Sequence, residues 1–274
     1  MEGPAGWDER RGPWGAPRRR RGREAVKRLV GRALAARRRP NDPGRGVGVL
    51  AYHATESDRS DPWWVDFEGQ MTLLEDLGYV VVPLLEAVRR VREGSPVQAP
   101  TLAITFDDGW SNNLRVAYPA LARRGWSSTV FVTSSFLGRA PFFRPEELRS
   151  LADLGVEVGN HTHAHPDLTR LSPQAIAAEL AECDRILSDL AGRRPRTFCY
   201  PFGLYSPAVR RAVEAYGFDA ACTGRVGFNT PGSDVFLLRR VTIEPGEGPT
   251  ELRWRLAGGY DFLDRKQAWM DAER

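Results

Sequence analysis

A chain of 274 residues, 42% of them hydrophobic and 27% charged, can bury a substantial core, and it contains no apolar stretch long enough to cross a membrane. The net charge of +4 is uneven, because residues 1–40 hold thirteen Arg or Lys against four Asp or Glu, which leaves the remainder at −5. This acidic remainder argues against nucleic acid as a partner, and three cysteines without a CxxC pair argue against a disulfide framework or a thiolate zinc site.

Residues 1–45 are predicted to form a disordered, arginine-rich arm that contains one short basic amphipathic helix. Residues 1–23 are rich in Gly, Pro and Arg, a composition typical of disorder. Residues 24–36 instead carry apolar side chains at the helical spacing i, i+3, i+4, i+7 and i+8, namely Val26, Leu29, Val30, Ala33 and Leu34. Such a helix can lie on an anionic membrane, dock on its own domain or stay frayed.

The start of the chain lacks the pattern of a secretory signal. Its arginines are followed by Glu-Ala-Val-Lys-Arg-Leu-Val-Gly-Arg at 24–32, and not by a continuous apolar segment. We therefore expect a protein of the cytoplasm or of the inner face of the membrane.

From residue 46 onward, strands alternate with helices. Strand-like apolar runs occur at Val47–Tyr52, Tyr79–Val82, Leu102–Phe106, Thr129–Thr133, Val156–Gly159, Thr197–Tyr200, Asp219–Cys222 and Leu237–Ile243. Helical segments occur at Phe67–Leu77, Leu84–Glu93, Asn113–Arg124, Pro145–Leu154, Pro173–Leu190 and Pro207–Tyr216. This alternation predicts an α/β fold in which seven or eight units form a closed or nearly closed (β/α) barrel. We expect a single domain over 46–260 and a C-terminal tail over 261–274.

Two adjacent carboxylates, Asp107 and Asp108, follow the third predicted strand in the sequence Thr-Phe-Asp-Asp-Gly. The mouth of such a barrel lies at the C-terminal ends of its strands, and two ionised carboxylates there are costly unless something uses them. A metal ligand beside a general base is one use. A plain turn in which Asp108 caps the next helix is the alternative.

Three of the four histidines follow the fifth predicted strand, in Asn-His-Thr-His-Ala-His at 160–165. His161 and His165, four residues apart, fall on one side of a helical turn and can share a metal, whereas His163 points elsewhere. Together with one Asp they leave coordination positions open, as a catalytic metal requires. Zinc is the expected ion, although iron, manganese or cobalt suit the same ligands.

Thr-Phe-Asp-Asp-Gly followed at this distance by His-Thr-x-x-His, at residues 161–165, resembles the polysaccharide deacetylase family, also called the NodB-homology domain, over residues 47–245. The resemblance implies a distorted (β/α) barrel of the NodB type, with an open groove. It also implies that Asp107 is the general base and that Asp108, His161 and His165 bind the metal. The activity implied is metal-dependent hydrolysis of a C–N amide bond.

The third motif of the family is represented here by Cys-Tyr-Pro-Phe-Gly at 199–203, without the Arg of the commoner pattern. It is similar to the branch that includes poly-N-acetylglucosamine deacetylases, as are Ala-Tyr-His at 51–53 and Arg-Val-Thr-Ile at 240–243. The resemblance implies that the backbone N–H of Phe202 helps to hold the oxyanion, since Pro201 has no N–H. Tyr200 is expected to contact the substrate beside it.

The proton donor must differ from the usual family pattern, because no His follows His165 in the chain. The branch resemblance implies that His53 replaces the missing C-terminal His as general acid; a structural His at a strand end is the alternative. Arg240 is expected to supply the guanidinium that the third motif lacks and to keep Asp107 ionised, with an ordinary surface or domain ion pair as its alternative.

The expected substrate is an N-acetylated glycan or a lipid-linked sugar, from which acetate is released. Aromatic residues near strand ends, at 63–64, 110 and 142–143, either stack on sugar rings or pack in the core; Trp110 is counted among the substrate-binding candidates. Two alternatives have the same fold: a glycan-binding pseudoenzyme, and an amidohydrolase for a non-sugar amide. The basic arm could also recruit the domain to anionic lipid or to a partner protein, and the sequence does not predict an oligomeric state.

Overall fold

The computed structural model describes residues 21–94 and 98–264. Its strands are β1 (Val47–Tyr52), β2 (Val80–Val81), β3 (Thr101–Phe106), β4 (Ser128–Val132), β5 (Val156–Asn160), β6 (Thr197–Cys199), β7 (Ala220–Val226) and β8 (Leu238–Thr242). Its α-helices are α1 (Arg21–Ala35), α2 (Phe67–Asp76), α3 (Leu84–Glu93), α4 (Ala117–Ala122), α5 (Pro145–Asp153), α6 (Pro173–Ala191), α7 (Pro207–Tyr216) and α8 (Pro249–Leu256).

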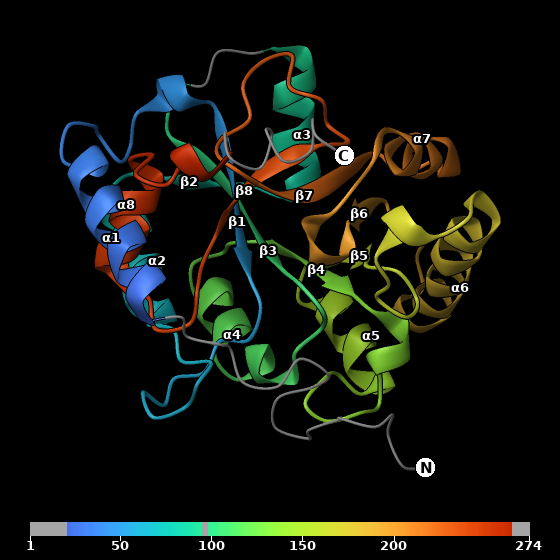
Figure 1. The fold of residues 1–274 in the computed structure, drawn as a ribbon. Coiled ribbons are helices and arrows are strands. Elements are labelled where there is room, and N and C mark those ends of the chain that lie inside the picture. The colour runs from blue at the N-terminus through green and yellow to red at the C-terminus, as the bar shows by residue number, and fades with distance from the viewer. Residues whose placement is uncertain (1–20, 95–97, 265–274) are drawn as a thin grey trace.

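Seven parallel strands close into a barrel, because β1 pairs with β8 on one side and with β3 on the other. The eighth strand, β2, pairs with the first residues of β3, and β4 pairs with the last residues of β3 along the same edge. The expected (β/α) barrel in a single domain is therefore confirmed, with β2 as the element that distorts the ring. Figure 1 shows the helices around the outside of the strands.

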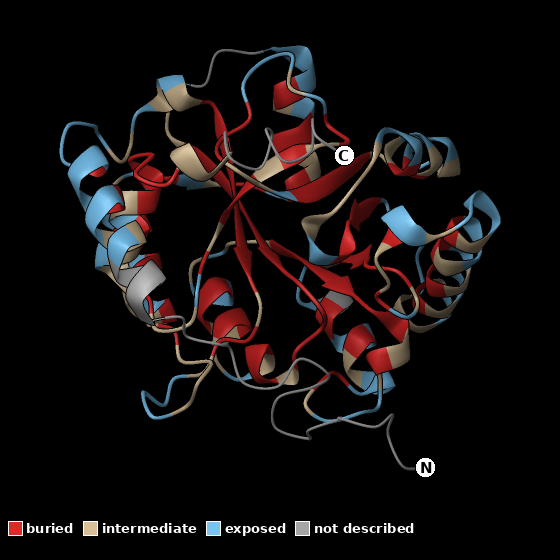
Figure 2. Ribbon diagram, viewed as in Figure 1, coloured by how far each residue is buried: buried red, intermediate tan, exposed pale blue. Residues whose placement is uncertain are grey.

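Burial explains why these segments form strands. All six residues of β1 and of β3 are buried, as expected for parallel strands covered on both faces by side chains of the barrel interior and of the helices. Figure 2 shows the strands buried and the outer faces of the helices exposed. Apolar side chains between strands and helices form two large clusters, and a smaller aromatic cluster of Trp110, Phe136 and Phe142 lies near the barrel mouth.

Most predicted elements are present within one or two residues of the predicted ends, and three differ, of which the helix expected over 24–36 is described below. The helix expected over Asn113–Arg124 is split into a 3-10 turn, Ser111–Leu114, and the short helix α4. The side chains of Asn112 and Asn113 are buried and bonded to the loop after β1, which holds this turn away from a regular helix. Strand β7 extends to Val226, because its pairing with β8 resumes there after an irregularity.

The helix expected over residues 24–36 is α1, and it lies against α8 on the outside of the barrel (Figure 1). Residues 21–23, expected to be disordered, belong to this helix. Residues 1–20, also expected to be disordered, lie outside the described residues. Residues 265–274, most of the predicted tail, lie outside them as well. None of the helices in the described ranges is long and apolar enough to span a membrane.

Candidate metal centre and active site

A pocket of about 360 Å³ opens at the C-terminal ends of the strands. Its wall includes residues that follow or end β1, β3, β5, β6 and β8, so segments far apart in the sequence meet there. The predicted residues His53, Asp107, Asp108, His161, His165, Tyr200, Phe202 and Arg240 all line it. This is the position at which parallel (β/α) barrels gather their functional groups.

Asp107 and Arg240 form a buried ion pair across the barrel. The two guanidinium nitrogens Nη1 and Nη2 each donate to one carboxylate oxygen of Asp107 at 2.8 Å, and Nε donates to the carbonyl oxygen of Thr223. Both side chains are at most 5% exposed. Burial alone would raise the pKa of Asp107, but the guanidinium outweighs it and holds that pKa below its ordinary value. Asp107 is therefore ionised and fixed in orientation.

Asp108 faces a different set of partners from its neighbour. Its backbone has a φ of +73°, which turns the second carboxylate away from the first. Its Oδ1 lies 3.4 Å from Nε2 of His161 and 3.6 Å from Nε2 of His165, and these two nitrogens are 3.2 Å apart. Three ligand atoms thus converge on one point at the floor of the pocket.

The ring of His161 is oriented by the third motif. Its Nδ1 lies 2.7 Å from the carbonyl oxygen of Cys199, which can only accept a hydrogen bond, so Nδ1 carries the proton. The other ring nitrogen, Nε2, is then left with a lone pair that faces Asp108. A backbone carbonyl that fixes the tautomer in this way is the usual outer partner of a metal-bound histidine.

The loop that carries the histidines is held by its own side chains. Asn160 Oδ1 accepts from the backbone N–H of Thr162, and Thr162 Oγ1 accepts from the backbone N–H of His165. These bonds stabilise positive φ angles at Thr162 and His165, which place the His165 ring beside that of His161. His163 turns away and shares a hydrogen bond with Ser134.

The Asp108, His161 and His165 group fits a divalent metal on three counts. Asp108 Oδ1 is buried and has no hydrogen-bond partner among the described residues, which is costly unless a cation is its partner. The separations of 3.2–3.6 Å match the spacing of about 3.4 Å between ligands that each lie about 2.1 Å from a tetrahedral zinc. Burial and the neighbouring His161 lower the pKa of His165 to about 4, so this ligand is neutral at pH 7.

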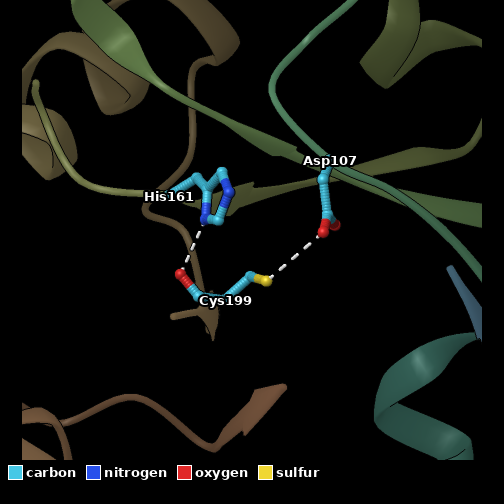
Figure 3. A group of neighbouring side chains, drawn as sticks. All are labelled: Asp107, His161 and Cys199. Atoms are coloured by element: carbon cyan, nitrogen blue, oxygen red, sulfur yellow. Dashed lines mark hydrogen bonds between the residues drawn. The ribbon is translucent and has the colours of Figure 1, made fainter. Parts of the chain in front are cut away.

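Asp107, His161 and Cys199 also lie close enough to hold an ion, but their chemistry does not suit one (Figure 3). Both oxygens of Asp107 are already paired with Arg240, and Nδ1 of His161 donates to the Cys199 carbonyl. Burial raises the pKa of the Cys199 thiol well above its ordinary value, so it stays protonated, and its Sγ lies 3.7 Å from Asp107 Oδ2. The thiol therefore acts as a weak donor to the carboxylate.

His53 stands beside Asp107 at the same height in the barrel. Tyr52 and Phe106 are paired residues at the ends of β1 and β3, so the residues that follow them are neighbours. Asn113 donates to the His53 carbonyl oxygen and fixes the backbone there. The half-buried imidazole of His53 lines the pocket, so it is placed to contact a ligand.

The third motif forms one wall of the pocket. The ring of Phe202 is 55% exposed and packs edge-on against His165, with ring centres 4.6 Å apart. Its φ is +57°, and the residue after it must be glycine, because a Cβ on Gly203 would overlap the backbone of Gly224. Tyr200 behaves differently: its ring is buried and its hydroxyl donates to the carbonyl oxygen of Phe236, so that group is not available to a substrate.

Trp110, expected to contact the substrate, is instead a support for the metal site. The side chain is 1% exposed, because Trp63 and Phe142 pack against its ring at about 4.8–4.9 Å between centres. Its Nε1 donates to Asp108 Oδ2 at 3.2 Å, which holds that carboxylate. Phe142 and Phe143 are likewise buried, so of the aromatic residues singled out near strand ends, Trp63 is the one whose side chain lines the pocket.

Two further residues of the site were not predicted from the sequence. Glu244 lines the pocket two residues after β8 and is exposed to solvent, so it adds negative charge to the rim. Its position just after a strand end was the available signal. The contact of the Cys199 thiol with Asp107 had no such signal, because it joins the end of β6 to the residue after β3, and these strands are not neighbours in the barrel.

The chain is similar to known proteins in sequence and in fold. The family model for polysaccharide deacetylases matches residues 94–221. The chain is 28% identical over 199 residues to a Bacillus subtilis (strain 168) protein with the name "Putative polysaccharide deacetylase YxkH", a match that covers 72% of this chain and 71% of that protein. Among solved structures, it is similar to IcaB from Ammonifex degensii, with a TM-score of 0.70, 24% identity, and coverage of 78% of this chain and 98% of that one. The Streptococcus pyogenes deacetylase PplD in complex with acetate gives a TM-score of 0.69 at 22% identity, covering 77% and 97%.

Substitution of Asp108 should remove metal binding. We expect the purified chain to carry about one zinc ion per molecule, and we expect Asp108→Asn to weaken zinc affinity at least about 100-fold, since an anionic ligand is lost. Elemental analysis after dialysis and competition with a chelating dye measure both quantities. Asp189→Asn, at a side chain 70% exposed, is the matched control and should retain the metal. Equal metal content in Asp108→Asn and the control would refute the assignment.

Proposed function

We propose that this chain, whose residues 94–221 match the family model for polysaccharide deacetylases, is a metal-dependent hydrolase that removes the N-acetyl group from an N-acetylated sugar or glycan and releases acetate. The observation that carries the proposal is that two adjacent carboxylates have different partners. Asp107 is bound to a guanidinium, and Asp108 converges with His161 and His165 on one point beside it. One carboxylate is thus available as a base and the other as a metal ligand.

Asp107 acts as the general base in this proposal. Arg240 keeps the carboxylate ionised and holds it in one orientation, so that it can accept a proton from water in the pocket. A zinc ion held by Asp108, His161 and His165 would polarise the amide carbonyl and lower the pKa of bound water toward neutrality. The weak bond from the Cys199 thiol helps to fix Asp107 without removing its charge.

His53 acts as the general acid, and Phe202 helps to hold the developing oxyanion. His53 lies next to Asp107 at the end of the neighbouring strand, on the accessible side of the pocket, where it can protonate the departing amine. The backbone N–H of Phe202 belongs to a loop held close to Gly224, and a fixed donor of this kind stabilises charge without reorganisation. Acetate then leaves, and the free amine remains on the sugar.

The pocket supports a sugar as the substrate. Its volume of about 360 Å³ lies in the range of small-molecule sites, and its wall combines the exposed ring of Phe202 and the Trp63 side chain with polar groups. Aromatic rings beside polar groups suit a sugar, which has apolar C–H faces and hydroxyl edges. In this pocket the two aromatic side chains, Phe202 and Trp63, lie in the wall beside such polar groups.

An acetate-release screen tests the proposed function. The zinc-loaded chain is incubated with N-acetylglucosamine oligomers, with a lipid-linked N-acetyl sugar and with a non-sugar acetanilide, and acetate is measured enzymatically. We expect release from one or both sugar classes and little from acetanilide. Release from acetanilide alone would indicate a non-sugar amidohydrolase, and glycan binding without any acetate would indicate a pseudoenzyme; either result would overturn the proposal.

Asp107→Asn should slow turnover strongly while metal binding persists. An amide cannot accept the proton from water, so kcat should fall by about 100-fold or more. The zinc content should match the wild type, because the metal ligands remain. Asp189→Asn again serves as the control, and near-normal kcat in Asp107→Asn would contradict the role of general base.

His53→Ala should change the pH dependence as well as the rate. A general acid must be protonated, so activity should fall toward high pH, and this basic limb should be lost in the variant along with about 100-fold in kcat. The matched control is His163→Ala, since His163 lies in the same region but bonds to Ser134. An unchanged pH profile in His53→Ala would exclude its role as acid.

Arg240→Met should move the acidic limb of the kcat/KM profile to higher pH. The guanidinium lowers the pKa of Asp107, and activity requires the ionised carboxylate, so activity falls as the pH drops through that pKa. Loss of Arg240 should raise the pKa and shift the limb upward by about 1 pH unit or more.

The variant Arg255→Met controls for the loss of a buried ion pair. Arg255 is 7% exposed and makes two hydrogen bonds to Glu247. Both variants should cost about 3–5 kcal/mol of unfolding free energy. The limb should shift in Arg240→Met alone; equal profiles for the two variants would show that Arg240 has only a structural role.

A further inference from the structure

Exposed apolar side chains gather on the outer face of α1. The large hydrophobic residues that are exposed within the described ranges number seven, and four of them are on this helix: Val26 (62%), Leu29 (69%), Val30 (38%) and Leu34 (43%). Ala33 is exposed as well. Their spacing of i, i+3, i+4, i+7 and i+8 places all five on one stripe, which we call the outer stripe. Figure 2 shows α1 largely exposed on the side away from the barrel.

The opposite face of α1 holds the helix on the domain through small and charged residues. Gly31 and Ala35 are buried, and a Cβ at position 31 would lie 2.9 Å from the ring of Tyr260. Arg28 lies 3.8 Å from Glu251 of α8. An amphipathic helix that serves only to cover its own domain buries its apolar face. Here the apolar face points outward, so the domain does not cover this face, although the opposite face of α1 packs on it.

The positive charge around the outer stripe indicates which kind of partner it binds. Residues 21–39 contain eight Arg or Lys and one Glu. The exposed Arg32 lies next to Leu29 around the helix, and Arg37–Arg39 follow its end, all exposed. A second copy of the chain would bring the same positive charge to a face-to-face contact, which opposes such a dimer. The partner must therefore offer an apolar region to the outer stripe and negative charge to the surrounding arginines. An anionic lipid bilayer has this structure, because its acyl chains lie just below a negatively charged layer of headgroups.

We propose that α1 binds the surface of an anionic lipid bilayer, with the outer stripe at the boundary of the acyl chains and the flanking arginines among the headgroups. The contact is interfacial, since no described helix is long and apolar enough to span a bilayer. Long basic side chains can reach the headgroups while their stems cover apolar surface. The stripe lies opposite the face that packs on α8, so binding leaves the domain attached. The proposal does not depend on the reaction catalysed in the pocket.

Vesicle sedimentation of the full chain tests this proposal. Vesicles of phosphatidylcholine alone are compared with vesicles that contain phosphatidylglycerol as well. We expect binding to the anionic vesicles, weakened by high salt, and little binding to the neutral ones. The double variant Val26→Ser/Leu29→Ser should lower the partition coefficient about tenfold or more, because the two most exposed apolar side chains of the stripe are lost.

Leu154→Ser is the matched control, since Leu154 is 59% exposed but lies at the end of α5, away from α1. It should bind vesicles like the wild type. Thermal unfolding and acetate release from a soluble substrate should be the same for all three proteins, which separates loss of membrane binding from loss of fold or activity. The proposal is overturned if the wild type stays in the supernatant with anionic vesicles, or if the double variant binds them as tightly. It is also overturned if light scattering shows a dimer that the double variant dissociates.

Discussion

The buried pair of Asp107 and Arg240 is the interaction on which the rest of the site depends. Two ionised carboxylates cannot stay side by side in a semi-enclosed pocket without compensation. Arg240 neutralises the first through two hydrogen bonds of 2.8 Å, so the negative charge left for a cation is that of Asp108. One guanidinium therefore gives two chemically identical neighbours different electrostatic environments. Active sites commonly separate the properties of paired carboxylates in this way.

Backbone geometry makes this separation possible. Within the described residues, four non-glycine positions have a positive φ: Asp108, Thr162, His165 and Phe202. All four lie in the loops that form the site, whereas the strands and helices around them have ordinary backbone angles. A positive φ is unfavourable for such residues, and it persists where surrounding contacts hold it. At Thr162 and His165 those contacts are hydrogen bonds to the side chains of Asn160 and Thr162, and at Asp108 the indole N–H of Trp110 donates to the carboxylate. The stability of the barrel thus maintains the strain that orients the ligands.

The strand pattern and the polar strand ends could be predicted because they follow from periodicity and from the geometry of parallel barrels. The positions of Asp108, His161 and His165 in one pocket required only that β3 and β5, which β4 separates, end at the same mouth of the barrel. The orientation of Trp110 could not be predicted, since an aromatic residue at a strand end can face either solvent or core, and packing by Trp63 decides it. The helical stripe of α1 was recognised from its spacing, but the face that meets the domain is decided by Gly31 and Tyr260.

The register of the barrel also explains why His53 and Arg240 lie at different depths, although both come from strands at its closure. Leu50 pairs with Val241, so Arg240 lies at the level of Val49, inside the barrel and below the strand ends. From there its guanidinium reaches Asp107 from beneath and is 5% exposed. His53 lies four residues further along β1, past the strand end, where its half-buried ring meets the pocket. In the proposed mechanism, this difference in depth makes the guanidinium a support for the base and leaves the imidazole as the group that can touch a substrate.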